Sequence, residues 1–488
     1  MEGEDGGLCS SLAALTHPES GANGDEMAAS SRLSVRVTAL QDDSPISAFA
    51  VAMAAIALGQ ALQVGNGNLH PQAVVWLSVA MLGCTAAVWM SRSRRMPALG
   101  TTAALAVTGI AIAVQLIELL TARPGMYVQL SSPRAFVPFV SGIAIASLLA
   151  GAGFAPSSWL GPFRIPALLL VHFLLGVWLI RATPNPYIDV YFFQRDGLNA
   201  LLRGVDPYAI TFPDIYGNLP FYGPGVSVGG RLTFGFPYPP LSLLMALPGH
   251  LLTGDYRYSQ LAAMTLAGGL MAYSRPGALP AFAATLFLFT PRIFFVLEQG
   301  WTEPLVLVLL AATVFAACRA PKQVPLLFGL FLASKQYSFL AAPCLALLAP
   351  RPFQWTQYGR ALGKAVLVAL AITLPFFLWN VPAFVRSVIT LQLHQPFRAD
   401  ALSYLSWFAR GDQHWPTWLA FVAAALGAAL AVWRCAPSPA GFSTGVALTL
   451  IAFFAFNKQA FCNYYFLVIG ACSLGLAATR TALPRARE

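Results

Sequence analysis

The stretch IPALLLVHFLLGVWLI at residues 165–180 decides the fold class, because His172 is its one ionisable side chain. As a helix, these residues would rise about 24 Å through a hydrocarbon core about 30 Å thick. Similar apolar runs recur from Ile46 to Leu476, and they lack the alternation that marks the strands of a membrane barrel. Helices and closed barrels are the structures that can span a bilayer. The sequence therefore predicts an all-α, polytopic transmembrane bundle.

The overall composition agrees with this fold class. Hydrophobic residues make up 57% of the chain and charged residues 10%, compared with about 25% charged residues in soluble domains. The net charge of +10 is spread over short loops instead of forming one basic patch. We interpret these charges as topology signals and as contacts with anionic membrane lipids, and we expect no nucleic-acid partner.

The positions of the basic residues predict how the chain crosses the membrane. Arg92, Arg94 and Arg95 form the strongest basic cluster and are expected in the cytoplasm. Two long stretches, 182–236 and 382–415, then become large loops on the non-cytoplasmic side. The total is about 13 helices, and the clearest spans lie at about 45–62, 73–91, 101–121, 135–153, 163–181, 363–381, 416–433, 442–457 and 461–478.

Two regions between these spans have a less regular pattern. Two short helices are expected to meet near Lys335 at the outer surface. The segment 238–253 is interrupted by Pro248-Gly249-His250, so it either re-enters the membrane or lies at the interface.

Residues 189–203 predict an amphipathic helix in the first outer loop, since the run contains no proline and has apolar residues at helical spacing. Asp189, Asp196 and Arg203 are each seven residues apart and fall on one stripe, while Phe193 would rest in the membrane interface. This stripe is either a solvated polar face or part of a site in which Asp189 acts as a general base. A carboxylate at the membrane boundary can take the proton of an attacking hydroxyl.

Other ionisable residues stand where hydrocarbon or its boundary is expected, namely Arg292, Glu298, Glu303, Lys335 and Lys458. Such groups face an internal cavity and bind substrate, or they are structural residues that reach for the interface. Arg398 in the second outer loop is either solvated or suited to bind a phosphate through its forked donors. The seven cysteines show no C-x-x-C spacing, and no metal-ligand cluster or phosphate-binding glycine loop is present.

Several short motifs resemble the GT-C superfamily of integral membrane glycosyltransferases. The branch that they resemble most is glycosyltransferase family 87, the polyprenyl-phosphate-mannose-dependent mannosyltransferases. The resemblance covers roughly residues 165–478. It rests on Asp189-x6-Asp196-x3-Ala200-Leu-Leu-x-Gly204-x-Asp-Pro207-Tyr208, Phe236-Pro-Tyr238-Pro-Pro240-Leu, Glu298-Gln299-Gly300, Ser334-Lys335-Gln336-Tyr337 and Asn463-Tyr464-Tyr465. One departure is Trp301-Thr302-Glu303, where the family often has an Asn.

The resemblance implies a reaction and a site. A hexose, with mannose as the expected sugar, would pass with inversion from a polyprenyl phosphate to a hydroxyl of a lipid or glycan acceptor. Asp189 matches the family's catalytic base, and no cofactor is expected, although a divalent metal would be compatible. The substrate-binding residues implied are Asp196, Arg203, Tyr208, Tyr238, Arg292, Glu298, Gln299, Lys335 and Arg398, of which Lys335, Arg292 and Arg398 would stabilise the leaving phosphate.

The resemblance also implies a division of the chain and a location. Residues 1–44 are acidic and rich in small residues, so we expect a disordered cytoplasmic tail. A four-helix membrane extension at 45–160, a GT-C-like catalytic region at 161–480 and a cytoplasmic tail at 481–488 follow. The expected location is the bacterial cytoplasmic membrane, with the active site on the non-cytoplasmic side.

Three other functions remain open at this point. A transporter or lipid flippase would show paired halves and broken helices with polar residues near the bilayer midplane. A scaffolding protein would not need two large outer loops with facing charges. Loop composition does not distinguish a hexose transferase from a GT-C transferase for another sugar, such as a pentose. The acceptor and the oligomeric state are likewise left undetermined by the sequence.

Overall fold

A computed structural model of the protein describes residues 44–93, 97–130, 132–154, 161–217, 219, 221–410 and 415–480. All of these belong to one compact unit. The predicted tails at residues 1–43 and 481–488 lie outside the described residues. Ser44, which we expected to end the N-terminal tail, is instead buried, and its hydroxyl accepts a hydrogen bond from Ser47 N at the start of the first described helix.

The described residues are mostly helical, and six segments are long and apolar enough to cross a membrane. They match six of the predicted spans and indicate a membrane-embedded protein. These segments are α2 (Pro45–Gly65), α3 (Pro71–Trp89), Thr102–Thr121 within α4 (Pro97–Thr121), Arg134–Gly151 across η1 (Pro133–Phe136) and α5 (Val137–Gly151), α6 (Gly161–Ala182) and α14 (Trp355–Trp379).

The remaining elements are shorter. They are η2 (Ala152–Phe154), α7 (Asp189–Leu202), β1 (Ser227–Val228), β2 (Arg231–Leu232), α8 (Pro240–Thr253), α9 (Arg257–Ala272), α10 (Ala278–Leu288), α11 (Ile293–Glu298), α12 (Glu303–Arg319), η3 (Pro321–Gln323), α13 (Val324–Ser334), η4 (Gln336–Leu348), α15 (Val381–Phe384), η5 (Val385–Thr390), α16 (Leu391–His394), α17 (Tyr404–Phe408), α18 (Leu419–Arg434), α19 (Pro439–Ala455) and α20 (Cys462–Ala478). The two strands form a small antiparallel hairpin.

The predicted count of about 13 helices is wrong, because the described residues contain 19 α-helices. The extra helices arise partly where apolar segments are broken. Between α10 and α11, Pro291 disfavours helical geometry in the residue before it, and Arg292 adopts a left-handed conformation with φ 65°. Between α13 and η4, Lys335 is extended, with φ −155° and ψ 149°. The two short helices expected around Lys335 are therefore present.

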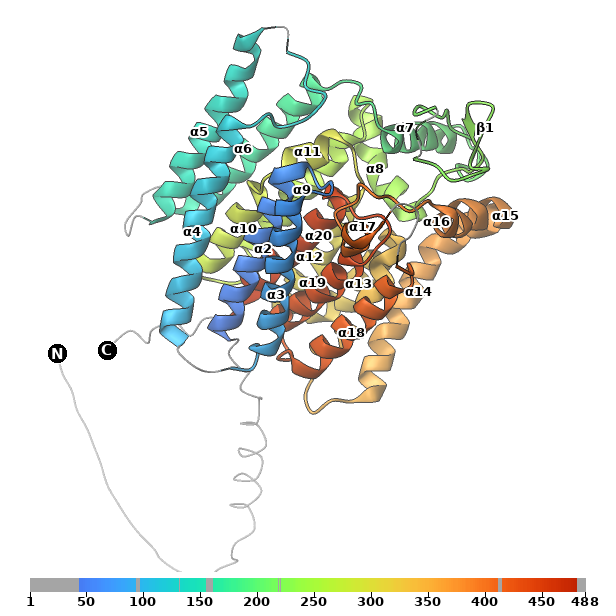
Figure 1. Ribbon diagram of the computed structural model, residues 1–488. Coiled ribbons are helices and arrows are strands. Elements are labelled where there is room, and N and C mark those ends of the chain that lie inside the picture. Colours follow the sequence, from blue (N-terminus) through green and yellow to red (C-terminus); the bar gives the residue numbers. More distant parts are fainter. Residues whose placement is uncertain are drawn as a thin grey trace, which may run out of the picture. The chain divides into compact units, whose positions relative to one another are not determined.

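The first and last described helices pack side by side. In Figure 1, α2 and α3 lie against α20 and α19, and residue contacts join α2 to α20 and α3 to α19. Helices in membranes associate through small residues that let backbones approach closely. At Gly83 in α3, an added Cβ would lie 3.1 Å from the Cβ of Ala54 in α2. The N-terminal helices are thus part of the same packed bundle as the rest.

Exposed tryptophans mark both ends of α18. Trp418 precedes the helix and Trp433 lies in its last turn, next to Arg434, whose guanidinium sits 3.9 Å above the ring of Trp89. Tryptophan and arginine are enriched at the two boundaries of a membrane. At about 1.5 Å per residue, α18 is about 24 Å long, so it is short for a span, yet both of its ends carry boundary residues.

Candidate functional site

The predicted amphipathic helix is present as α7, and Asp189 is its first residue. Oδ1 of Asp189 accepts a hydrogen bond from the N–H of Val190 over 2.7 Å. A carboxylate at this position also interacts favourably with the positive end of the helix dipole. Phe193 does not face the membrane interface, as we had expected; its buried ring lies 4.8 Å from that of Phe212 and 5.6 Å from that of Phe234. The apolar face of α7 packs on the protein itself.

Two tyrosines from the following loop hold Asp189. The hydroxyl of Tyr222 donates to Oδ2 over 2.8 Å, and the N–H of Asp189 donates to the hydroxyl of Tyr216 over 3.2 Å. Burial raises the pKa of Asp189, while the bonds from Tyr222 and Val190 and the charge of Arg398 lower it in part. The carboxyl therefore holds a proton more tightly than a solvated aspartate, as a general base requires.

Arg398 supplies a positive charge that acts on Asp189. Its guanidinium lies 4.2 Å from the centre of the Phe221 ring and 4.9 Å from that of Phe461. Its forked donors bind both carboxylate oxygens of Asp400, at 2.8 and 2.7 Å. Stacking and a bidentate pair together fix the plane of the guanidinium. Asp400 is exposed, so solvent reaches this pair.

A second cation, Lys335, is buried close by. Its Nζ lies 3.1 Å from Oε1 of Glu303 and 3.9 Å from the centre of the Tyr238 ring, and it donates to the hydroxyl of Thr302. Tyr337 also donates to Oε1 of Glu303 over 3.0 Å. The ammonium is thus largely balanced by a buried carboxylate, as buried charges require.

Tyr238 links these two groups of residues. Burial raises the pKa of its phenol, and the negative charges of Asp189 and Glu303 both raise it further. Tyr238 therefore lies within electrostatic reach of both acids. We call the resulting cluster the Asp189 site; it consists of Asp189, Tyr222, Tyr238, Glu303, Lys335 and Arg398.

Tyr208 supports this site through a hydrogen bond to the backbone of Tyr238. Its buried hydroxyl donates to the carbonyl of Tyr238 over 2.9 Å, and its ring lies 4.7 Å from that of Phe384. Tyr208 thus positions Tyr238 and is not exposed to a substrate.

Glu298, Gln299 and Arg292 lie in a different cluster. The buried carboxylate of Glu298 accepts the N–H groups of Met126 and Tyr127, at 2.6 and 2.8 Å, and the amide of Gln299 at 3.1 Å. Arg292 is half-buried and donates to the carbonyl of Arg123 over 2.9 Å. Glu298 and Arg292 therefore bind the loop after α4, and Gln299 binds Glu298.

Asp196 and Arg203 line a separate cavity of about 360 Å³, together with Asn199 and Leu202. Asp196 pairs with Arg195 over 2.8 Å. Seven residues of helix place Asp196 about 10 Å along the axis from Asp189. Of the predicted stripe, Asp196 and Arg203 line this cavity, whereas Asp189 is not among its lining residues.

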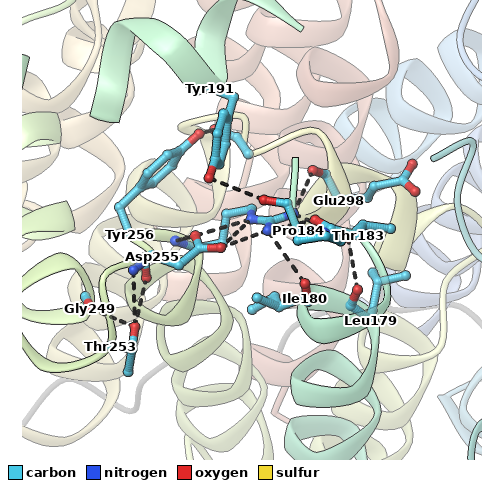
Figure 2. Close-up of polar contacts among 12 residues, drawn as sticks. Leu179, Ile180, Thr183, Pro184, Tyr191, Gly249, Thr253, Asp255, Tyr256 and Glu298 are labelled. Carbon is cyan, nitrogen blue, oxygen red and sulfur yellow. Dashed lines mark hydrogen bonds and ion pairs between the residues drawn. The ribbon is translucent and has the colours of Figure 1, made fainter. Parts of the chain in front are cut away.

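Sequence reasoning missed Arg257, a fully buried arginine between α6, α9 and α11. Its guanidinium pairs with Asp255 at 2.6 Å and donates to Thr183 O at 2.8 Å and Glu298 O at 3.3 Å. Figure 2 shows Thr183, Asp255 and Glu298. The neighbouring Asp255 was the one available signal, since the other partners are distant in sequence.

The described residues contain no group of three or more His, Cys, Asp or Glu side chains that could hold a metal ion. None of the six cysteines among them forms a disulfide. No protein-family model matches the chain, and neither the curated proteins nor the solved structures contain a match. A functional conclusion must therefore rest on the chemistry of the site.

Proposed function

We propose that this protein is a membrane glycosyltransferase that moves a hexose, with mannose as the expected sugar, from a polyprenyl phosphate to a hydroxyl of a lipid or glycan acceptor. The observation that carries the proposal is the half-buried carboxyl of Asp189, whose pKa burial raises, which is held by the hydroxyl of Tyr222 and on which the positive charge of Arg398 acts. A base and a phosphate-binding cation are the two groups that this transfer needs.

The proposed step is a single displacement. The acceptor oxygen bonds to the anomeric carbon from the face opposite the phosphate, so the configuration inverts. The bond between that carbon and the phosphate oxygen breaks, and the polyprenyl phosphate leaves with the electron pair. Asp189 takes the proton of the attacking hydroxyl, while Tyr222 keeps the carboxylate oriented through its bond to Oδ2.

Among the cations, Arg398 is the best suited to stabilise the leaving phosphate. Its fork is bound to the exposed Asp400, which a phosphate can displace. Lys335 contributes less net charge, because Glu303 balances it. Arg292 is bound to the loop after α4, so we assign it no role in the transfer.

The distribution of arginines supports the proposed place of the site on the non-cytoplasmic side of the membrane. Four arginines donate to carbonyls at the helix ends on one side of the bundle: Arg92 to Cys435, Arg275 to Ala478, Arg319 to Ser274 and Arg434 to Trp89. By the positive-inside rule this side is cytoplasmic. Helix α20 begins at Cys462, beside Phe461, whose ring stacks on Arg398. It ends at Ala478, on the side where the four arginines lie. The Asp189 site therefore belongs to the opposite side.

The test compares membranes that contain wild type, Asp189→Asn or Asp196→Asn at equal expression. Each is given radiolabelled polyprenyl-phosphate mannose, and transfer to endogenous acceptors is followed. We expect Asp189→Asn to lose at least about a hundredfold in rate, the lower end of a general-base contribution. Asp196→Asn, on the same helix, should lose far less. Equal transfer rates for Asp189→Asn and wild type would show that Asp189 is not the general base.

Transport of a lipid-linked sugar is the second candidate. It is favoured by the two broken helices at Arg292 and Lys335 and by the buried pair of Lys335 with Glu303, because transporters use discontinuous helices with charged groups inside the bundle. In the same membranes, movement of a labelled lipid-linked sugar across the bilayer without any transfer of its sugar would favour this alternative.

A further inference from the structure

The segment 122–130, which follows α4, lies along the turn that joins α6 to α7. Gln129 N donates to Ala182 O over 2.8 Å, at the end of α6. The hydroxyl of Tyr127 donates to Tyr187 O over 2.8 Å. Asp189 begins α7 two residues later. A segment supplied by the N-terminal helices is therefore bonded to the turn that carries the proposed base.

Glu298 fixes this segment from its other side. Its carboxylate binds the N–H groups of Met126 and Tyr127, and a Cβ added at Gly125 would lie 2.2 Å from Oε1. Glycine at 125 is thus what lets the backbone approach so closely. Burial raises the pKa of Glu298 and the backbone bonds oppose the rise, so the two N–H donors help to keep the carboxyl ionised.

From Tyr187 the contacts continue to Asp189. The hydroxyl of Tyr187 donates to Ile215 O, and its ring meets that of Tyr216 edge to face, with 6.2 Å between centroids. The hydroxyl of Tyr216 accepts the N–H of Asp189. The bond from Tyr127 is therefore the first link in a chain of contacts that ends on the backbone of the proposed base.

The earlier part of the same turn is fixed independently. Arg257 binds both the carbonyl and the hydroxyl of Thr183, and Tyr191 donates to Pro184 O over 3.3 Å; Figure 2 shows Thr183, Pro184 and Tyr191 together. Residues 183–184 thus have their own anchors. The bond from Tyr127 acts further along, at Tyr187, directly before Asp189.

We propose that Tyr127 is a positioning residue for Asp189, so that the N-terminal helices contribute to catalysis through the segment 122–130. This inference rests on the proposed function. Tyr127 touches neither donor nor acceptor in this scheme. It holds the carbonyl of Tyr187 and thereby the place and the partial burial of the Asp189 carboxyl.

The test is Tyr127→Phe, which removes one hydroxyl. A misplacement of about 1 Å can lower a rate by up to about a hundredfold, and we expect kcat to fall about tenfold with radiolabelled polyprenyl-phosphate mannose, with KM for this donor unchanged. The acidic limb of the pH–rate profile should also move to lower pH. A loosened Asp189 is better hydrated, so its pKa falls toward the ordinary value. A purely structural tyrosine would not move this limb.

Tyr404→Phe is the matched control, since its partly buried hydroxyl lies 3.0 Å from the hydroxyl of Ser78 in α3. It should leave kcat and the limb unchanged. Gly125→Ala provides a second variant, because its Cβ must push the segment away from Glu298, and it should change kcat in the same direction as Tyr127→Phe.

Asp189→Asn in the same assay separates the two proposals. If Asp189→Asn is inactive while Tyr127→Phe and Gly125→Ala keep wild-type kcat and pH profile, the positioning role is wrong and the proposed function stands. If Asp189→Asn is as active as wild type, Asp189 is not the base and the positioning role falls with it. If wild type itself transfers no label, the proposed function fails.

Discussion

Asp189 is surrounded by groups that change its acidity in opposite directions. Burial raises its pKa, whereas Tyr222, the N–H of Val190 and the charge of Arg398 favour the ionised form. The balance leaves the carboxyl more basic than a solvated aspartate. Removing any one of these groups should therefore change the pH at which Asp189 becomes protonated and stops acting as a base. The direction of the change depends on the group removed.

Tyr222→Phe should move the acidic limb of the transfer rate to higher pH. The hydroxyl bonds to the ionised carboxylate, so its loss raises the pKa of Asp189 further. Activity needs the ionised base and disappears as pH falls through that pKa. A hydrogen bond of about 1 kcal/mol corresponds to about 0.7 pH units. The measurement is the pH–rate profile beside that of Tyr404→Phe, and a limb that stays in place or moves to lower pH would contradict this role.

Several site residues were predictable one by one, but their neighbours were not. Asp189, Tyr238, Lys335 and Arg398 stood out as ionisable or aromatic residues within short motifs. Lys335 lies 3.9 Å from the ring centre of Tyr238, and the charge of Arg398 acts on Asp189. Tyr222 comes 33 residues after Asp189 in a loop without periodicity, and no pattern ties it to a carboxylate. Loop residues of this kind are found only through the fold that brings them together.

At the level of elements, Arg257 joins the ends of three helices. It binds the last carbonyls of α6 and α11 from its place in the first turn of α9. Helix ends leave unpaired carbonyls, and a buried cation can satisfy several at once. The turn between α6 and α7 thereby becomes a rigid support for the Asp189 site.

Arg257→Met should lower the free energy of unfolding by about 3 kcal/mol or more, because it leaves Asp255 and buried carbonyls without their partner. The matched variant is Arg195→Met, which breaks the partly exposed pair with Asp196 and should cost about 1 kcal/mol or less. Detergent-solubilised protein unfolded by heat or by SDS gives the comparison. Equal losses in the two variants would mean that Arg257 is not a structural centre.

The elements that could be predicted are those whose signal is local. Apolar length identified α2, α3 and α6, and helical spacing identified α7. The breaks at Pro291 and Lys335 divide an apolar region whose composition is uniform, so the number of helices there depends on tertiary packing. The same is true of Phe193, which periodicity assigned to the membrane interface and which the loop 205–236 covers instead.

For the whole molecule, the proposed orientation gives a direct experiment. Val228 in β1 is 64% exposed, and Lys322 in η3 is also exposed, so cysteines at these positions can react. In intact cells, a membrane-impermeant maleimide should label Val228→Cys, and it should label Lys322→Cys only after lysis. The parent chain gives the background from its own cysteines. The reversed labelling pattern would mean that the protein has the opposite orientation in the membrane, with the Asp189 site facing the cytoplasm.

The packing of α2 against α20 also has a consequence for how the protein is made. About 400 residues separate the end of α2 from the start of α20, and at about 5 to 20 residues per second a ribosome needs about 20 to 80 s to synthesise them. During that time the face of α2 that α20 will cover stays open to lipid or to an insertion factor. A message cut short before α20 yields a chain whose α2 never completes its packing. Such a product should be degraded as misassembled even though it retains every residue of the Asp189 site.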